Sequence, residues 1–308
     1  MDIPQPTVKT GWVLIKVKAF GLNRAELFTR QGDSPGVTFP RVLGIECVGV
    51  VAEAPGTSFQ PGQKVVALMG GMGRQFDGSY AEYTLVPVSS VFAVETDLEW
   101  AKLGAIPEMF QTVWGSLTVG LEIAAGQTLL IRGGTSSIGM TATRLAKAAG
   151  LTVLATTRAP SKSDKLRDNG VDHVVIDNGN IHDEVYALVP GGVDRVLELV
   201  GTVTLRDSLK CATTGGIVCM TGILGSEWTL KEFTPMDDIP TGVKLTSYAG
   251  DAQHLDAARL QKFIADVAAG RQQLNLDRTF RLAEVPEAHR YMEGNQATGK
   301  LVVIVDES

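Results

Sequence analysis

The pattern of hydrophobic and polar positions divides the chain into three segments. Up to residue 95, apolar residues fall in short β-branched runs such as Glu46–Glu53 and Lys64–Leu68, separated by Pro-Gly and Asp-Gly turn signals. From residue 99 to about residue 250, strand-like runs alternate with stretches of helical periodicity. Strand-like runs return near the end, at Arg278–Leu282 and Lys300–Val305. The two ends therefore predict a small β-barrel or sandwich, and the middle predicts an α/β fold with a doubly wound parallel sheet.

These patterns predict two domains, which suits a length of 308 residues. We assign residues 1–95 and 252–308 to a β domain that is discontinuous in sequence, and residues 96–251 to the α/β domain. The strands predicted for the α/β domain are Gln127–Arg132, Leu151–Thr156, His173–Ile176, Val193–Val200, Gly216–Met220 and Lys244–Tyr248. The predicted helices are Ile138–Ala149, Lys162–Asn169 and Leu255–Ala269, while residues 8–95 are expected to be β throughout.

The amino-acid composition argues against several classes of function for this protein. The chain has 28 Lys and Arg against 34 Asp and Glu, a formal net charge of −6, so we expect no binding to nucleic acid or to an anionic membrane. Its three cysteines, Cys47, Cys211 and Cys219, form no Cys-x-x-Cys pair, which argues against a disulfide framework or a zinc knuckle. The first residues lack the pattern of a signal peptide, and no apolar run is long enough to span a membrane. A cytoplasmic location is the prediction.

A glycine-rich turn lies between the strand ending at Arg132 and the next predicted helix. Gly134 permits a tight turn, Gly139 permits close approach of helix and sheet, and the amides at the helix start can hold a pyrophosphate. Ser136 stands where the dinucleotide fingerprint has its middle glycine, so an ordinary tight turn is the alternative. The predicted phosphate-binding residues are Gly133, Gly134, Thr135, Ser136, Ser137, Ile138 and Gly139.

The end of the following strand bears on the choice of cofactor. A site for NAD places an acidic residue there to bind the ribose 2′-hydroxyl, but the segment from Thr156 to Lys162 has none. Thr157, Arg158 and Lys162 can instead hold a 2′-phosphate, which predicts NADPH as the cofactor. A solvated basic loop is the alternative interpretation.

With these motifs assembled, the chain resembles the medium-chain dehydrogenase/reductase superfamily, and within it the zinc-free NADPH quinone oxidoreductases. The resemblance extends over nearly the whole chain and implies a Rossmann domain together with a GroES-like β-barrel domain. It rests on Val17–Asn23, Leu43–Gly49, Gly78–Tyr83, Ala105–Trp114, Gly192–Asp194 and Gly299–Val302. The family normally opens with a β-hairpin ahead of its Ile-Pro-x-Pro segment, so the start at Met1 suggests that this hairpin is missing.

The resemblance also implies that zinc is absent. Where the family's alcohol dehydrogenases bind a catalytic zinc, this chain has Asn23, Ile45 and Glu108, which do not supply the thiolate and imidazole ligands that zinc prefers. The loop from Ala67 to Tyr83 lacks the cysteines of a structural zinc site. The histidines, which lie outside these motifs and are interpreted as surface or core residues, are His173, His182, His254 and His289.

By the same resemblance, Asn23 and Thr112 are expected beside the nicotinamide and the acceptor. Glu46 and Glu108 are expected behind them or donating through water, although they could equally be buried partners of backbone or arginine groups. The resemblance also implies that Thr221 and Gly222 border the nicotinamide and that Lys300 closes the cofactor site. Arg24 and Tyr80 are additional candidates, for which a surface role is the alternative.

Together these expectations predict hydride transfer from NADPH to a quinone or an α,β-unsaturated carbonyl. Such electron-poor acceptors need less polarisation than an alcohol needs for its oxidation. Two alternatives stay open: an enoyl-thioester reductase, for which Tyr80 is the candidate proton donor, and a non-catalytic NADPH-binding structural or sensor protein. By analogy with the family we also expect a homodimer formed through edge strands, with Gly216–Met220 and Lys244–Tyr248 as the candidate segments.

Overall fold

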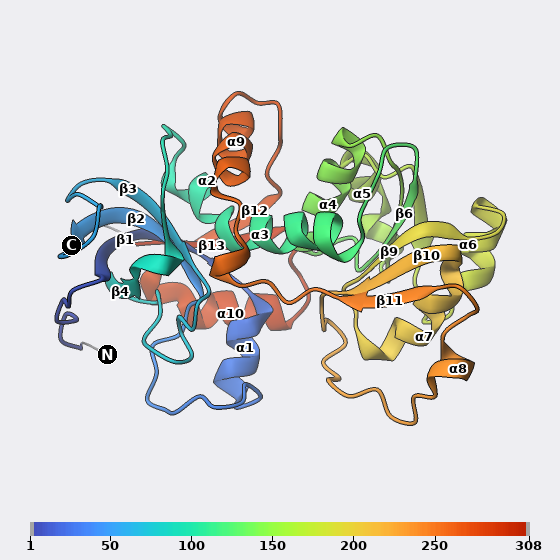
Figure 1. Cartoon of the computed structure of the whole chain (residues 1–308), viewed down its shortest axis with the longest axis horizontal. Helices are drawn as coiled ribbons and strands as arrows, with labels where there is room; N and C mark the ends of the chain where they lie inside the picture. Colours follow the sequence, from blue (N-terminus) through green and yellow to red (C-terminus); the bar gives the residue numbers. More distant parts are fainter. Residues whose placement is uncertain (1–2, 306–308) are drawn as a thin grey trace. The chain divides into compact units, whose positions relative to one another are not determined.

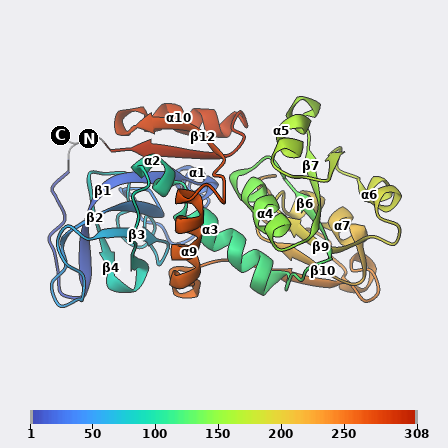
Figure 2. The same ribbon diagram turned by 90° about the horizontal axis from the view of Figure 1, so that it is seen from above.

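The computed structural model describes residues 3–305, and its backbone divides into two units. Unit 1 comprises Met1–Gln111 and Asp251–Ser308, and unit 2 comprises Thr112–Gly250. Figure 1 and Figure 2 give two views of the elements named below. Across residues 3–305, none of the helices has the length and apolar character needed to cross a membrane.

Unit 1 is built on a seven-stranded sheet with the order β12-β13-β1-β2-β3-β5, in which β4 also pairs with β1. Its pairs are antiparallel, except that β12 runs parallel to β13. The strands are β1 (Trp12–Leu22), β2 (Glu46–Glu53), β3 (Lys64–Leu68), β4 (Tyr83–Pro87), β5 (Val91–Ala93), β12 (Leu276–Arg281) and β13 (Lys300–Ile304). The helices are α1 (Arg24–Gln31), α2 (Trp100–Gly104), α9 (Ala257–Ala268) and α10 (Val285–Glu293), with the 3₁₀ turns η1 (Val88–Ser90), η4 (Ala252–His254) and η5 (Leu282–Glu284). The core of this unit includes the inward-facing side chains of Val13, Ile15 and Val17 on β1.

Unit 2 is a six-stranded parallel sheet with the order β11-β10-β9-β6-β7-β8. The strands are β6 (Thr128–Arg132), β7 (Thr152–Thr157), β8 (His173–Ile176), β9 (Val193–Glu198), β10 (Ala212–Met220) and β11 (Lys244–Ser247). The helices are α4 (Ser137–Ala148), α5 (Ser163–Asp168), α6 (His182–Leu188), α7 (Thr202–Cys211) and α8 (Pro235–Asp238), with the 3₁₀ turn η3 (Pro160–Lys162) and the π-helical turn η2 (Ser116–Gly120). Alternate residues of β6 enter two hydrophobic cores: Leu129 and Ile131 pack with α4, whereas Leu130 packs with α6 and α7. The sheet is therefore covered on both faces, as the alternation of strands and helices predicts.

The division between the units differs from the predicted one. It falls after Gln111, inside helix α3 (Pro107–Gly115), and after Gly250, instead of after residues 95 and 251. The reason is that α2 belongs with the β unit, where it packs on β1 and β13. Gly104 of α2 comes so close to β1 that a Cβ there would lie 2.9 Å from the Cβ of Ala19.

Two predictions about secondary-structure elements need correction. The segment 8–95 is not all β, because helix α1 follows β1 and is capped at its start by Asn23 and Glu26. Gly216–Met220 is not an edge segment, because β10 pairs with β9 on one side and with β11 on the other. Within the described part of the chain, β11 and β8 are the outer strands of this sheet. Of the two segments proposed for a dimer, only the one that contains β11 therefore lies at an edge, and a dimer through that edge remains a prediction.

Candidate functional site

The glycine-rich turn of unit 2 has the close approaches that its sequence predicts. Gly133 has a φ of +91°, in the left-handed region that favours glycine. A Cβ on Gly139 would lie 2.6 Å from the carbonyl oxygen of Gly133, so α4 can begin beside the turn only with glycine at that position. Ser136 caps the helix, because its Oγ accepts a hydrogen bond of 3.0 Å from the Gly139 amide. The turn and the start of α4 therefore fit a dinucleotide phosphate.

The three residues predicted to hold a 2′-phosphate lie at the end of β7 and in the connection to α5. Thr157 is buried, and its Oγ1 accepts a hydrogen bond of 3.2 Å from the amide of Ala159. The side chain of Arg158 is exposed, and Lys162 ends the short turn η3. The connection contains no acidic side chain, which is compatible with an additional phosphate group.

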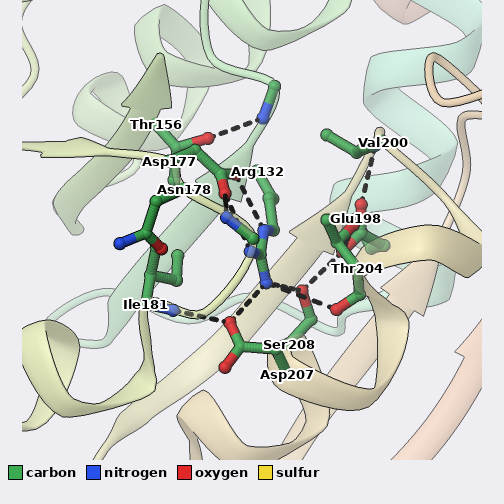
Figure 3. A network of polar contacts seen from close by, with 12 residues as sticks. Arg132, Thr156, Asp177, Asn178, Ile181, Glu198, Val200, Thr204, Asp207 and Ser208 are labelled. Carbon is green, nitrogen blue, oxygen red and sulfur yellow. Dashed lines mark hydrogen bonds and ion pairs between the residues drawn. The ribbon is translucent and has the colours of Figure 1, made fainter. Parts of the chain in front are cut away.

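A buried arginine immediately precedes the turn (Figure 3). Arg132, the last residue of β6, binds both carboxylate oxygens of Asp177 at 2.9 Å and one oxygen of Asp207 at 2.7 Å. Burial alone would lower the pKa of Arg132, but its hydrogen bond with Asp177 and the nearby carboxylates raise it, so the guanidinium stays charged. The nearby Glu198, at the end of β9, accepts hydrogen bonds from Gly201 and Thr204.

This network fixes the strand end from which the glycine-rich turn starts. Thr156, on the neighbouring strand, adds a further tie because its Oγ1 accepts a hydrogen bond of 3.0 Å from the Gly133 amide (Figure 3). The sequence prediction did not include Arg132 among the functional residues. The available signal was a charged residue at the end of the otherwise apolar strand Thr128–Arg132.

Thr112 and Thr221 are brought together in unit 2 by a serine that the sequence analysis did not identify. Ser116 is fully buried in the π-helical turn η2, a kind of turn that often occurs at functional sites. Its Oγ donates to the carbonyl oxygen of Thr112 at 2.7 Å and lies 2.9 Å from Oγ1 of Thr221. Gly222 follows, and a Cβ there would lie 2.4 Å from the carbonyl oxygen of Leu199.

In unit 1 the predicted residues Asn23, Glu46, Glu108 and Lys300 form one cluster. The Nζ of Lys300 lies 2.5 Å from Oδ1 of Asn23, 2.7 Å from Oε1 of Glu46 and 3.4 Å from Oε2 of Glu108. The lysine side chain is 1% exposed and that of Glu46 is fully buried. Burial alone would lower the pKa of Lys300, but Glu46 and Glu108 raise it above its ordinary value. The ammonium is therefore a fixed positive charge inside unit 1.

Glu26 is a member of this cluster that the sequence analysis overlooked. Its carboxylate accepts hydrogen bonds from the amides of Asn23 at 2.8 Å and Ile45 at 3.2 Å. Burial raises the pKa of Glu26 from 4.5 to about 7, with nearby Glu46 adding to the effect and Lys300 opposing it. The signal in the sequence was the Asn-x-x-Glu spacing of residues 23–26, which is typical of a helix start.

The remaining candidates of unit 1 are held by other contacts. The hydroxyl of Tyr80 forms a hydrogen bond of 3.0 Å with Nε2 of His289, and its ring stacks on Phe20. Burial lowers the pKa of His289 to about 4, so this imidazole is neutral at physiological pH. Arg24 donates hydrogen bonds to the side chain of Asn295, which lies just beyond α10, and to the carbonyl oxygen of Met292, which lies within α10. Neither Tyr80 nor Arg24 is bonded to the Lys300 cluster by these contacts.

The residues that stand where the family's alcohol dehydrogenases bind zinc differ in their chemistry from zinc ligands. Ile45 offers only an apolar side chain, Asn23 an amide and Glu108 a carboxylate, and the Lys300 ammonium lies among the polar groups. Among residues 3–305, His, Cys, Asp and Glu side chains nowhere gather in threes or more so as to hold a metal ion. Zinc requires thiolate, imidazole or carboxylate ligands without a competing cation, so these residues do not fit it.

The raised pKa of Glu26 gives a testable pH dependence of stability. A carboxyl group that binds its proton more tightly in the folded state contributes stability that is complete below about pH 4.5 and is lost as the pH rises through about 7. The difference corresponds to about 3 kcal/mol. We expect the unfolding free energy of the wild type, minus that of Glu26→Gln, to fall by about this amount between pH 4.5 and 8 in urea titrations. Groups such as His289 titrate in both proteins, so their contributions cancel in the difference between the two unfolding free energies. A difference in unfolding free energy that stays constant with pH would contradict the raised pKa of Glu26.

Comparisons with known proteins cover both units. Residues 9–96 match the family model described as "Alcohol dehydrogenase GroES-like domain", and residues 169–303 match the one described as "Zinc-binding dehydrogenase". The quinone oxidoreductase of Homo sapiens is 29% identical over 317 residues, which cover 99% of this chain and 92% of that protein.

Two other similarities extend over most of the chain. A phenolphthiocerol synthesis polyketide synthase type I of Mycobacterium bovis is 28% identical over 97% of this chain, which corresponds to 14% of that protein. The solved structure of mycobacterial Rv1454c complexed with NADPH has a TM-score of 0.86 at 23% identity, and covers 99% of this chain and 94% of that one. With its α/β architecture, its two family models and its end-to-end similarity to quinone oxidoreductases, the chain belongs to the medium-chain dehydrogenase/reductase superfamily of NAD(P)-binding oxidoreductases.

Proposed function

We propose that the protein is an NADPH-dependent reductase that transfers a hydride to a quinone or an α,β-unsaturated carbonyl without zinc. The observation that carries this proposal is the Lys300 ammonium held among Asn23, Glu46 and Glu108. Two of these residues, Asn23 and Glu108, stand where the resemblance puts the zinc ligands of the family's alcohol dehydrogenases. A site of this composition is poorly suited to deprotonating an alcohol, whereas an electron-poor acceptor needs only orientation and a proton. The similarity to quinone oxidoreductases supports the same choice of acceptor.

Each unit contributes residues with separate tasks in this proposal. In unit 2, the turn from Gly133 to Gly139 holds the pyrophosphate, and Thr157, Arg158 and Lys162 hold the 2′-phosphate. NADPH, when bound there, supplies the hydride. The remaining assignments are Thr112, Thr221 and Gly222 beside the nicotinamide and Asn23 orienting the acceptor. Glu108, at the partly exposed end of the Lys300 cluster, relays a proton from water to the reduced acceptor.

An enoyl-thioester reductase is the second candidate. The observation in its favour is the match of 97% of the chain to a segment of a polyketide synthase. In that reaction Tyr80 would be the proton donor, and it would have to exchange its hydrogen bond with His289 for one to the substrate. A non-catalytic NADPH-binding protein is the remaining possibility, and the same assay distinguishes all three.

The test of the proposed reaction is oxidation of NADPH by a panel of acceptors, followed by the loss of its absorbance. We expect turnover with 1,2- or 1,4-quinones or with simple enones, at a rate that a strong chelator does not change. Gly139→Ala is the matched negative control, because its Cβ would lie 2.6 Å from Gly133 O and would disturb the turn. Turnover with enoyl thioesters alone would favour the second candidate. Tight NADPH binding without turnover of any acceptor, or one zinc per chain in the active protein, would contradict the proposal.

The preference for NADPH has its own test in Arg158→Ala. Loss of a charged hydrogen bond to the 2′-phosphate should weaken NADPH binding by about 1.5–3 kcal/mol and leave NADH binding nearly unchanged. Titration of each cofactor against the variant measures both affinities. Arg167→Ala, which removes another exposed arginine from the adjacent helix α5, should change neither. Equal weakening of NADPH and NADH by Arg158→Ala would show that Arg158 does not bind the 2′-phosphate.

A further inference from the structure

The Nζ of Lys300 lies near three oxygen acceptors on three separate segments. These are Oδ1 of Asn23, which caps α1; Oε1 of Glu46, which begins β2; and Oε2 of Glu108 in the first turn of α3. A lysine ammonium has exactly three donors and no acceptor, so this arrangement uses its full hydrogen-bonding capacity. One buried cation therefore determines the position of three polar side chains.

The same contact determines which way the Asn23 amide faces. Because the ammonium only donates, the amide oxygen has to point towards Lys300. The amide nitrogen then points the other way, where Nδ2 lies 2.9 Å from Oε1 of Glu46 and 3.4 Å from Oε1 of Glu26. If the amide were flipped, it would place an N–H against the ammonium and an oxygen against the carboxylates.

The lack of a side chain at Gly21 leaves space for the Lys300 ammonium. Gly21, on β1, pairs with Val302 of β13, the strand that begins with Lys300. A Cβ on Gly21 would lie 2.3 Å from Oε1 of Glu46 and 2.4 Å from Cε of Lys300. The absent side chain at position 21 therefore allows the buried ion pair to form.

We propose that Lys300 is a positioning residue for the reductase reaction: its ammonium is the resident cation of unit 1, and it orients the Asn23 amide and the Glu108 carboxylate for the acceptor. This proposal rests on the function proposed above and adds the residue that prepares the acceptor-binding groups. It differs from the expectation that Lys300 closes the cofactor site, since the contacts of its ammonium are to an amide and two carboxylates.

Removal of the positive charge has a consequence that a purely structural role would not produce. The charged groups that face Lys300 are Glu26 of α1, Glu46 of β2 and Glu108 of α3. Lys300 opposes the burial that raises the pKa of Glu26, so without the ammonium that pKa rises above about 7. A pH profile that depends on this cluster then moves to higher pH.

The experiment compares Lys300→Met with Gly21→Ala in the full-length protein. Lys300→Met removes the charge at nearly constant length, whereas Gly21→Ala keeps every charge and displaces Lys300 and Glu46. The rate of NADPH oxidation is measured from pH 5.5 to 9 with a saturating quinone, and the Kd of NADPH is measured by titration without acceptor. Lys262→Met, which changes an exposed lysine of α9, is the matched control.

Both test variants should lose about 100-fold in kcat, the typical effect of misplacing reacting groups, with the Kd of NADPH within about threefold of the wild type. Lys300→Met alone should also shift the pH profile to higher pH, and Lys262→Met should behave as the wild type. Gly21→Ala retains every charged group and only displaces Lys300 and Glu46, so it gives an answer even if Lys300→Met does not fold.

Three outcomes overturn the proposal. A folded Lys300→Met or Gly21→Ala variant with wild-type kcat would show that Lys300 does not position the acceptor-binding groups, although the proposed function would stand. Loss of NADPH affinity in parallel with kcat would assign Lys300 to the cofactor site instead. If the wild type reduces none of the acceptors, the proposed function itself fails, and the role of Lys300 fails with it.

Discussion

The ion pair between Lys300 and Glu46 is the interaction on which unit 1 depends. Both side chains are essentially excluded from solvent, and a buried charge is tolerated only where opposite charge and hydrogen bonds replace its hydration. The pair joins β13 near the end of the chain to β2 near its beginning, and Asn23 and Glu108 complete its coordination. Loss of either partner would leave the other, in the interior, without its nearest opposite charge.

Unit 2 also contains a buried cation that is stabilised by carboxylates, the guanidinium of Arg132. Arg132 is fully buried at the end of β6, and its planar guanidinium binds Asp177 through two parallel hydrogen bonds. Where the Lys300 ammonium fixes the groups proposed to orient the acceptor, the Arg132 guanidinium fixes the strand from which the phosphate-binding turn begins. Each unit thus uses one buried, donor-only side chain to set the geometry beside its candidate site.

Local patterns were sufficient to predict much of this architecture. The predicted strands Glu46–Glu53, Lys64–Leu68 and His173–Ile176 have the same bounds as β2, β3 and β8, because short β-branched runs between turn signals have few other ways to pair. The glycine-rich turn was also predictable, since its residues are adjacent in the chain. Helix α1 was missed because its eight residues lie among strand-like runs.

Long-range contacts account for what the sequence did not indicate. Asn23 and Lys300 are 277 positions apart, and no local pattern distinguishes a lysine that will be buried from one that remains in solvent. The role of Glu26 likewise depends on its burial beside Glu46, although its capping position was visible in the sequence. The boundary after Gln111 depends on the packing of α2 against β1, which a change in sequence texture near residue 96 does not reveal.

The central claim, that one buried ammonium organises unit 1, is tested most directly by a double-mutant cycle on stability with Lys300→Met and Glu46→Gln. The unfolding free energies of the wild type, the two single variants and the double variant give the coupling energy of the pair. The account predicts a coupling of about 2–3 kcal/mol, because either single change leaves a buried charge or polar group without its partner. The exposed Lys262–Asp266 pair, measured in the same way, should give at most about 0.5 kcal/mol. Equal and small coupling for the two pairs would contradict the account.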